Sequence, residues 1–500
     1  MNPGLICISV CAETVEDLIA QLRRAEPLAD ILEVRFDCLG DDARIAAMDA
    51  LRDAEFSEPV IATLRSPDEG GHAAILTRKL RLDFWRDLGD GFAFADLEQD
   101  IIADAASGTW LIASHHDLEG TPADIDAIYG DLASTQAEVI KIATTAHDIC
   151  DAIPIWNLLE RARNDGRDII PIAMGDAGKW TRILGPAYGA FLTFAPLDAG
   201  KETAGGQITA DDLINVYRAK NLDRETKVYG VIGDPVSSSL SPFMQNPAFV
   251  AAGLNSVFLP LAVKDLDTFM RRMVLPATHE VELNFAGFSV TMPHKQAIRA
   301  YLTEIDPVAA KIGAVNTVKL DGDKLTGYNT DAQGFITPLK QRIRDLKDAR
   351  VAVLGAGGAA RAVVYALLQE GAGVTVFARD TKKAQLLADE FDVRVAELTT
   401  IHHQPSTIDV IVNATPLGMR GRNEDKTLLT ADDLSGVRFV YDIVTRRDDT
   451  PLLREAKKAG VDCIGGVEML IAQGLRQFEV WTGLEPPSDV MRQAVLDRLK

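Results

Sequence analysis

The chain has 500 residues, 47% hydrophobic and 25% charged, which is enough for about two to four globular domains with buried cores. Its formal net charge of −21 argues against nucleic acid or an anionic membrane surface as a partner. No apolar run reaches the length of a membrane span, and the first residues lack the basic region of a signal peptide. The five cysteines show neither a C-x-x-C pair nor zinc spacing. We therefore expect unpaired thiols, no metal and a cytoplasmic location.

Residues 1 to about 222 alternate short apolar runs with segments of helical spacing, such as residues 14–26. Eight candidate strands begin near Leu5, Asp30, Val60, Phe92, Trp110, Glu138, Asp168 and Ala190. Eight strand–helix units in a segment of this length predict a small (β/α)8 TIM barrel. A doubly wound sheet is the alternative, although one this wide is less common.

In a TIM barrel the chemistry belongs at the carboxyl ends of the strands. Those ends are rich in ionisable groups in this sequence. Desolvation favours the neutral amine of a lysine that faces a barrel interior, and a neutral amine such as that of Lys141 can attack a ketone to form an imine. His116 on the preceding strand would then move protons. Strand parity sends His115 and His116 to opposite faces, so only one can reach the mouth. A lysine that snorkels to water and a structural histidine are the alternatives.

Six short motifs in this half resemble those of type I 3-dehydroquinate dehydratase. They are Glu33-Val-Arg35, Thr63-Leu-Arg65, Glu69-Gly-Gly, His116-Asp117, Lys141-Ile-Ala and Gly206-Gln207. The resemblance implies that Lys141 forms a Schiff base, that His116 is the proton shuttle and that Glu69 assists it. It also implies that the following residues bind substrate: Glu33, Arg35, Arg65, Arg182, Thr203 and Gln207.

The seam between the halves is short. Thr209-Ala-Asp-Asp212 resembles a capping box and predicts a helix that runs to about Asn221. Residues 223–226 are polar, and a new strand begins at Val228. A linker of this length cannot separate the two halves widely.

The second half contains a strand, glycine turn and helix in the order that binds dinucleotides. Val351 to Leu354 predict a buried strand, and a helix follows over residues 362–369. Backbone N–H groups and the helix dipole at such a turn favour the charge of a pyrophosphate. Arg379 ends the second strand, where NAD-binding folds place an acidic residue, and therefore favours NADPH over NADH.

Further motifs in this half resemble shikimate dehydrogenase over residues 227–500. They are Ser239 and Ser241, Val290 to Lys295, Gly313 to Thr317, Asn329 to Asp331, Asn413 to Met419, and Gly466 to Gln473. The resemblance implies that Lys295 and Asp331 form the catalytic pair. The residues implied to bind substrate are Ser239, Ser241, Thr291, Asn316 and Gln473. Those implied to bind the cofactor are Gly355, Ala356, Gly357, Gly358, Ala359, Arg379, Thr381 and Met469.

We therefore interpret the chain as an α/β fusion of two enzymes that act on small molecules. Residues 1–222 form the dehydratase barrel, 227–335 with 470–500 the substrate-binding domain, and 345–469 the Rossmann NADP-binding domain. The barrel would convert 3-dehydroquinate to 3-dehydroshikimate, and the second module would reduce that product to shikimate with NADPH, without a metal or prosthetic group. One alternative is a catabolic quinate or shikimate dehydrogenase fusion that uses NAD. Another is a non-catalytic quinate- or shikimate-sensing regulator, but such a protein is expected to have lost one of the four residues Lys141, His116, Lys295 and Asp331.

Overall fold

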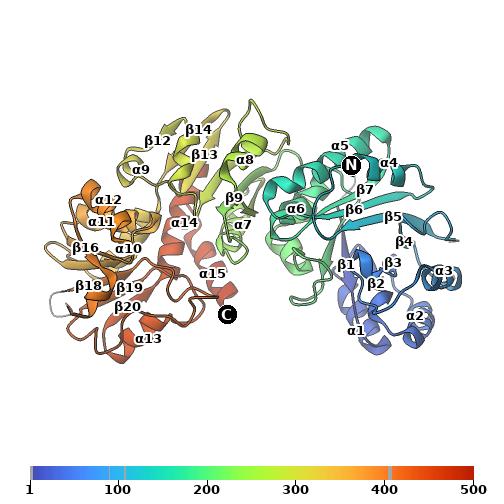
Figure 1. Cartoon of the computed structure of the whole chain (residues 1–500), viewed down its shortest axis with the longest axis horizontal. Helices are drawn as coiled ribbons and strands as arrows, with labels where there is room; N and C mark the ends of the chain where they lie inside the picture. The colour runs from blue at the N-terminus through green and yellow to red at the C-terminus, as the bar shows by residue number, and fades with distance from the viewer. Residues whose placement is uncertain (1–3, 89–90, 106–107, 404–407) are drawn as a thin grey trace. The chain divides into compact units, whose positions relative to one another are not determined.

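The computed structural model describes residues 4–88, 91–105, 108–403 and 408–500, and Figure 1 colours them from blue at the N-terminus to red at the C-terminus. The chain divides into two compact units. The first comprises Met1–Val228, Asp234–Ser237 and Asn255–Phe285, and the second comprises Tyr229–Gly233, Ser238–Leu254 and Ala286–Lys500. Among the described residues, no helix is both long enough and apolar enough to cross a membrane.

The first sheet is a nearly closed barrel of eight parallel strands in the order β7-β6-β5-β4-β3-β2-β1-β8. The strands are β1 (Leu5–Val10), β2 (Ile31–Arg35), β3 (Val60–Thr63), β4 (Phe94–Glu98), β5 (Trp110–Asp117), β6 (Val139–Thr145), β7 (Asp168–Met174) and β8 (Leu192–Pro196). A backbone hydrogen bond of 2.8 Å from Phe191 N to Ile169 O links the start of β8 to β7. The structure thus confirms the predicted barrel.

Helices cover the outside of the barrel strands. They are α1 (Val15–Ala25), α2 (Asp41–Ala54), α3 (Arg78–Asp87), α4 (Ile125–Ala133), α5 (Ile153–Asp165) and α6 (Lys179–Tyr188). In α1 the Thr14 side chain accepts a hydrogen bond of 3.2 Å from Asp17 N, and Leu18 and Leu22 form a buried stripe on one face. Inside the barrel, alternate strand residues form an apolar core that includes Cys7, Ile61 and Ile170.

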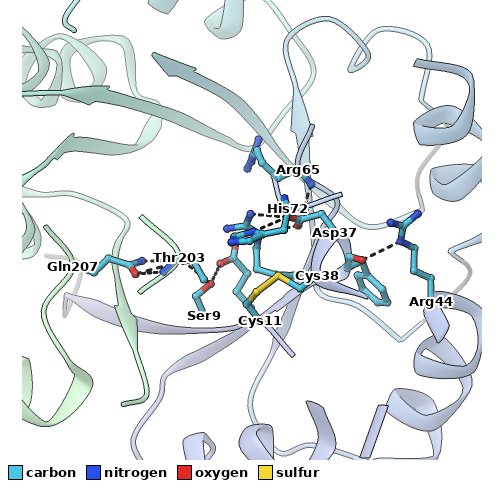
Figure 2. The surroundings of a disulfide bond; sticks show 12 residues. Ser9, Cys11, Asp37, Cys38, Arg44, Arg65, His72, Thr203 and Gln207 are labelled. Carbon is cyan, nitrogen blue, oxygen red and sulfur yellow. Dashed lines mark hydrogen bonds and ion pairs between the residues drawn. A yellow bond between two sulfur atoms is a disulfide. The ribbon is translucent and has the colours of Figure 1, made fainter. Parts of the chain in front are cut away.

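Two cysteines near the mouth of the barrel are paired, which corrects the expectation of unpaired thiols. Cys11 follows β1, Cys38 ends the short helix η1 (Phe36–Cys38), and their sulfur atoms form a disulfide (Figure 2). Sequence spacing does not reveal this pair, because the parallel register of β1 and β2 brings the two strand ends together. Cys7, Cys150 and Cys463 are free thiols.

The seam helix is shorter than predicted. Thr209 Oγ1 accepts a hydrogen bond of 3.2 Å from Asp212 N, as the capping motif indicated, but the helix ends with the π-helical turn η5 (Asp212–Val216). Arg218 has a left-handed backbone with φ of 53°, which a continuing α-helix cannot contain. A separate 3-10 turn, η6 (Ala219–Asn221), follows.

The second sheet has six strands in the order β10-β9-β11-β13-β14-β12. They are β9 (Lys227–Gly233), β10 (Ser256–Ala262), β11 (Phe285–Val290), β12 (Glu304–Ile305), β13 (Thr317–Asp321) and β14 (Lys324–Tyr328). The helical segments of this region are α7 (Ser241–Ala251), α8 (Leu266–Phe269), η7 (Met270–Val274), η8 (Ala297–Tyr301), α9 (Pro307–Ile312) and α10 (Asp331–Arg342). In the antiparallel pair of β13 and β14, Thr317 lies opposite Tyr328 at the end of β14. Asn316, just before β13, donates from its backbone N to Tyr328 O at 3.1 Å and so lies close to the start of α10.

The third sheet is parallel and has the order β17-β16-β15-β18-β19-β20, which is the strand order of a Rossmann fold. Its strands are β15 (Arg350–Leu354), β16 (Gly373–Ala378), β17 (Arg394–Glu397), β18 (Val410–Asn413), β19 (Phe439–Asp442) and β20 (Asp462–Gly465). The helices are α11 (Gly358–Gln369), α12 (Thr381–Phe391) and α13 (Pro451–Lys458). The strand order reverses between β15 and β18, directly beside the glycine turn. This confirms the predicted Rossmann architecture.

The last two helices return to earlier parts of the second unit (Figure 1). α14 (Gly466–Thr482) packs against α10, and α15 (Ser488–Leu499) packs against α7. At the closest approach of α10 and α14, a Cβ on Gly334 would lie 2.5 Å from Gln473 Cβ, so only glycine fits there.

Candidate active sites

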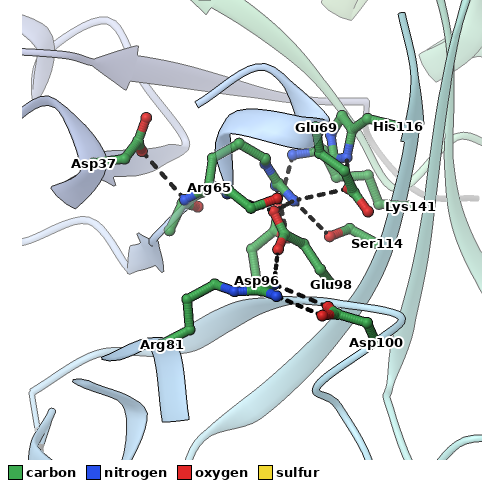
Figure 3. Close-up of polar contacts among 12 residues, drawn as sticks. Asp37, Arg65, Glu69, Arg81, Asp96, Glu98, Asp100, Ser114, His116 and Lys141 are labelled. Atoms are coloured by element: carbon green, nitrogen blue, oxygen red, sulfur yellow. Dashed lines mark hydrogen bonds and ion pairs between the residues drawn. The ribbon is translucent and has the colours of Figure 1, made fainter. Parts of the chain in front are cut away.

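Lys141 is the third residue of β6, and its side chain lies among charged residues inside the barrel (Figure 3). Its Nζ is 2.7 Å from Asp96 Oδ2 and 3.9 Å from Glu33 Oε1. The same nitrogen lies 4.2 Å from the centre of the Phe194 ring, and the residue is only 5% exposed. The Lys141 side chain therefore does not snorkel to water.

Arg65 bridges the acidic groups around that lysine. Its guanidinium forms an ion pair of 2.9 Å with Asp96 and donates a hydrogen bond of 2.9 Å to Ser114 Oγ. Burial opposes ionisation of Asp96, but the Arg65 and Lys141 cations outweigh it and hold the pKa of Asp96 well below its usual range. Asp96 therefore stays an anion and fixes the position of the lysine amine.

His116 and Glu69 form a hydrogen-bonded pair beside this cluster (Figure 3). His116 Nδ1 lies 2.8 Å from Glu69 Oε2. Burial lowers the pKa of His116, and the Arg65 and Lys141 cations lower it further, so the imidazole is neutral at pH 7. Burial also raises the pKa of Glu69 to about 8, even though Arg65 opposes this shift. A neutral imidazole next to a carboxyl group of shifted pKa is suited to accepting and returning a proton.

The strand register shows which of the two adjacent histidines of β5 faces the interior of the barrel. His116 pairs with Ala143, a member of the interior apolar cluster, whereas His115 pairs with Ile142 on the opposite face. The two histidine side chains therefore lie on opposite faces of β5, as alternation along the strand predicted.

A hydrogen-bonded chain holds Glu33 on the other side of Lys141. Ser9 Oγ donates to Glu33 Oε2, and Thr63 Oγ1 donates to Glu33 Oε1 at 2.8 Å. Thr203 extends this chain through a hydrogen bond of 3.4 Å to Ser9 Oγ, and its backbone N donates to Gln207 Oε1 at 2.8 Å (Figure 2). The loop after β8 is thereby tied to the mouth of the barrel.

The two other arginines at the mouth differ in their partners. Arg35 forms a double hydrogen bond with Asp37, at 2.9 and 2.8 Å. Arg182 is 2% exposed, donates to Gly205 O at 3.3 Å, and has no carboxylate partner among the described residues. Burial lowers the pKa of Arg182 to about 10. A buried, uncompensated cation is unfavourable unless an anion binds to it.

Lys295 and Asp331 meet in the second unit. Lys295 Nζ donates to Asp331 Oδ2, and Asn316 Nδ2 donates to Asp331 Oδ1 at 2.8 Å. Thr330 N donates in turn to Asn316 Oδ1 at 2.7 Å, which fixes the orientation of the Asn316 amide. The lysine side chain remains 17% exposed, whereas that of Asp331 is buried. Asn316 therefore holds Asp331 in position, while the side chain of Lys295 stays partly exposed to solvent.

The four other residues expected to bind substrate in this unit lie on three elements. Ser239 and Ser241 stand at the start of α7, where Ser241 N donates to Ser239 Oγ at 3.3 Å. Thr291 follows β11, and its N donates to Ile232 O at 3.0 Å. Gln473 on α14 is buried and donates to Leu470 O at 2.9 Å. Among the described residues none of the four is hydrogen-bonded to Lys295 or Asp331.

The glycine turn after β15 fits a dinucleotide phosphate. Gly355 has a φ of 107°, and a Cβ there would lie 2.9 Å from Ala414 O. Gly357 caps α11 without a side-chain hydrogen bond, which leaves the first N–H groups of that helix available to a ligand. A Cβ on Gly358 would lie 3.3 Å from Lys295 Cβ, so the turn adjoins the catalytic candidate. Ala356 and Ala359 are half-buried in the same turn.

The remaining cofactor candidates have different surroundings. Arg379 is exposed after β16, and Thr381 begins α12 behind Asp380, whose side chain accepts from Lys383 N at 3.0 Å. Met469 on α14 is buried in the apolar cluster of the third sheet.

Protein-family models match nearly the whole chain. Residues 6–224 match type I 3-dehydroquinase, 231–318 the shikimate dehydrogenase substrate binding domain, 338–460 shikimate / quinate 5-dehydrogenase, and 466–496 the shikimate 5'-dehydrogenase C-terminal domain. The bifunctional 3-dehydroquinate dehydratase/shikimate dehydrogenase of Arabidopsis thaliana, named chloroplastic, is 34% identical over 98% of this chain and 84% of its own length. The chain belongs to this bifunctional family.

Two relatives of the dehydrogenase half alone are also similar. A shikimate dehydrogenase (NADP(+)) of Methanocella arvoryzae is 43% identical over 54% of this chain and 99% of its own length. A crystal structure of a shikimate dehydrogenase in complex with NADP+ is 36% identical, with a TM-score of 0.50, over 56% of this chain and 98% of that one.

Sequence reasoning missed several polar residues of this dehydratase–dehydrogenase. Asp96 and Glu98 face the lysine site from β4. The sequence could have indicated them, because they are acidic residues at alternate positions of an otherwise apolar strand. Gln477, one helical turn after Gln473, donates from Nε2 to Ser289 Oγ and Thr317 Oγ1, both at 3.1 Å. The sequence could have indicated Gln477, because residues four apart on a helix lie on the same face, and Gln473 was already expected to bind substrate.

Proposed function

We propose that the barrel dehydrates 3-dehydroquinate to 3-dehydroshikimate, and that the second unit reduces 3-dehydroshikimate to shikimate with NADPH. One observation carries this conclusion: two separate lysine-centred sites occur in one chain. Lys141 is buried beside a histidine–glutamate pair, whereas Lys295 adjoins a dinucleotide-binding turn. The first arrangement suits imine chemistry, and the second suits protonation of a carbonyl oxygen during reduction.

Dehydration begins at Lys141. The Lys141 ammonium group passes a proton to the neutral imidazole of His116, and the free amine adds to the ketone carbon of the substrate. The former carbonyl oxygen takes up one proton from the nitrogen and one from His116 and leaves as water, so a protonated imine forms. The imine withdraws electrons from the neighbouring carbon, so that His116 can remove a proton there and return it to the departing hydroxyl group as water. Hydrolysis of the imine then releases the product and regenerates the amine. Asp96 and Glu33 hold the nitrogen in place throughout.

Glu69 sets which nitrogen of His116 acts as base. When Glu69 is ionised, it accepts the Nδ1 proton and leaves Nε2 free to remove a proton; when it is protonated, it donates to Nδ1, and the histidine proton occupies Nε2. Because the pKa of Glu69 is raised to about 8, the ionised form accumulates only as the pH rises through that value. The histidine and glutamate titrate as a coupled pair.

We therefore expect kcat/KM of the dehydratase to rise roughly tenfold between about pH 7 and pH 9, since kcat/KM reports groups of the free enzyme. Glu69→Gln should lower activity and remove this rise, because the amide cannot ionise. The measurement is the pH profile of 3-dehydroshikimate formation in both proteins. A rise that persisted in the glutamine variant would assign it to another group.

The arginines supply the positive charge that an anionic substrate needs in an acidic protein. Arg182 supports this role most strongly, because it is buried without a carboxylate partner in the described part of the chain. We assign it to the substrate carboxylate. We assign Arg35 and Arg65 to substrate hydroxyl groups, together with Glu33, Thr203 and Gln207, because these residues line the same mouth.

In the dehydrogenase, Lys295 donates the proton to the carbonyl oxygen while Asp331 holds the ammonium group in position. NADPH supplies the hydride when it is bound; the uncapped N-terminus of α11 and the cradle at Gly355 fit its pyrophosphate. We assign Ser239, Ser241, Thr291, Asn316 and Gln473 to the carboxylate and hydroxyl groups of the substrate, and Met469 to the edge of the nicotinamide.

Arg379 is proposed to contact the 2′-phosphate of NADPH. It is exposed at the end of β16, where an acidic residue would instead bind the ribose hydroxyl of NAD. A charge-assisted hydrogen bond contributes about 1.5–3 kcal/mol, so Arg379→Ala should lower kcat/KM for NADPH roughly ten- to a hundredfold. kcat/KM for NADH should barely change. Steady-state rates with both cofactors check this, and a wild-type enzyme that prefers NADH would refute the assignment.

The proposal is tested against its catabolic alternative by four substrate and cofactor combinations. Wild-type enzyme should reduce 3-dehydroshikimate with NADPH much faster than with NADH, and should oxidise shikimate faster than quinate. A preference for quinate with NAD would favour the catabolic function instead.

Domain bounds and location are also proposals. The boundaries of 1–222, 227–335 with 470–500, and 345–469 can be tested by limited proteolysis. We propose a cytoplasmic location, which imaging of the tagged chain would test.

A further inference from the structure

The disulfide lies one residue away from a side chain that organises the dehydratase mouth (Figure 2). Cys38 directly follows Asp37, and it is bonded to Cys11 at the end of the neighbouring strand. Both cysteines are half-buried, so a small thiol reagent can reach the bond. In contrast, the free thiols of Cys7 and Cys150 in the same unit are buried.

Asp37 joins three parts of the barrel mouth. Its carboxylate accepts both hydrogen bonds of Arg35, which we assign to substrate binding. It also accepts from the backbone N of His72 at 3.0 Å and from the backbone N of Arg65 at 3.3 Å. Although burial opposes ionisation, the hydrogen bonds from His72 and Arg35 hold the pKa of Asp37 well below its usual range. The position of Arg35 thus depends on the turn that the disulfide anchors.

His72 places an imidazole beside the two sulfur atoms. One ring nitrogen and both sulfurs lie within 4.8 Å of one another. An imidazole near a thiol favours the thiolate, which is the form that attacks a disulfide. Accessible sulfurs with a neighbouring imidazole are typical of a pair that exchanges, not of an inert structural crosslink.

We propose that Cys11 and Cys38 form a reversible thiol–disulfide site that controls the affinity of the dehydratase for its substrate. On oxidation, one thiolate attacks a small-molecule disulfide and releases one of its halves as a thiol. The second cysteine thiolate then attacks the mixed disulfide, the S–S bond of the protein forms, and the other half leaves as a thiol. Two protein thiols are oxidised and one disulfide is reduced; a dithiol reverses both steps.

The oxidised state is the one with higher affinity. The bond fixes the turn that carries Asp37, and Asp37 fixes Arg35, so the mouth is preorganised for the substrate. Reduction frees this turn, whose ordering must then accompany binding. Because Lys141 and His116 make no hydrogen bond to Asp37 among the described residues, kcat should change little. We expect reduction to raise KM for 3-dehydroquinate roughly five- to thirtyfold, which corresponds to the cost of about 1–2 kcal/mol for ordering the backbone of one residue.

The test measures dehydratase kcat and KM in a glutathione disulfide buffer and after dithiothreitol treatment, with a chelator present so that thiol-bound metal plays no part. Mass spectrometry after alkylation counts the free thiols in each sample. Cys11→Ser, Cys38→Ser and the double variant should keep the higher KM in both buffers. Cys150→Ser is the matched control and should respond as wild type does.

Asp37→Asn separates this proposal from a merely structural role of the bond. It should raise KM in both buffers and abolish the redox response, while a dehydratase kcat close to that of wild type reports that the barrel is folded. An unchanged KM in wild type of verified thiol state, or a redox response that persists in the double serine variant, would overturn the inference. The inference rests on the proposed dehydratase function, but its failure is distinguishable: an active enzyme that ignores redox state refutes only the switch, whereas inactivity in both states refutes the function as well.

Discussion

Lys141→Ala is expected to abolish dehydration of 3-dehydroquinate, with a loss on the order of 10⁴ or more in kcat, because no other amine occupies the position between Asp96 and Glu33 in the described barrel. Reduction of 3-dehydroshikimate by the same variant should stay near the wild-type rate, since Lys141 belongs to the first compact unit and Lys295 to the second. Both rates can be measured separately on one preparation.

Borohydride trapping locates the amine directly. Treatment of wild type with borohydride in the presence of 3-dehydroquinate should inactivate the dehydratase and leave a reduced adduct on the peptide that contains Lys141. Lys179→Ala removes a lysine of the same barrel that pairs with Asp176, and it should leave both the adduct and the activity intact. An adduct on another residue, or full dehydratase activity in Lys141→Ala, would exclude the imine mechanism at this position.

Lys295→Ala should reduce the dehydrogenase rate by about 10²- to 10⁴-fold, the contribution of a positioned general acid. Asp331→Asn should also lower the rate, but by less, because it keeps the shape of the side chain and loses only the ionic hold on Lys295. Dehydration should remain intact in both variants. Steady-state reduction of 3-dehydroshikimate with NADPH measures the loss of dehydrogenase activity in both variants. Formation of 3-dehydroshikimate from 3-dehydroquinate without cofactor measures whether dehydration remains intact.

Lys311→Ala, which removes an exposed lysine from α9, is the control for this series and should behave as wild type. If a folded Lys295→Ala variant lost dehydration as well, the two sites would not be independent, and the account of separate chemistry would have to be replaced.

The sequence was sufficient to predict the fold because its periodic signals are strong. The eight apolar runs of the barrel each stand between helical segments, and every strand begins at most two residues from its predicted start. The glycine turn at Gly355 also predicted the dinucleotide-binding fold, because that fold requires a strand, a residue with positive φ and a helix in this order. Alternation along β5 even separated His116 from His115.

The sequence did not reveal partners that only the register brings together. Asp96 belongs beside Lys141 because β4, β5 and β6 are neighbours, and Asp37 takes both hydrogen bonds of Arg35 through the turn of η1. The Cys11–Cys38 bond was missed for the same reason, since the cysteines lie 27 residues apart and meet only at the ends of adjacent strands. Arg218 ended the seam helix early through a backbone conformation that no residue-type rule predicted.

The central claim is that one chain carries two complete and independent active sites. It is tested most directly by following NADPH oxidation after adding 3-dehydroquinate, the substrate of the first site alone. We predict that wild type oxidises NADPH, that Lys141→Ala and Lys295→Ala each fail to do so, and that an equal mixture of the two variants restores oxidation. A wild-type chain that leaves NADPH unchanged, or a mixture that stays inactive, would contradict the account.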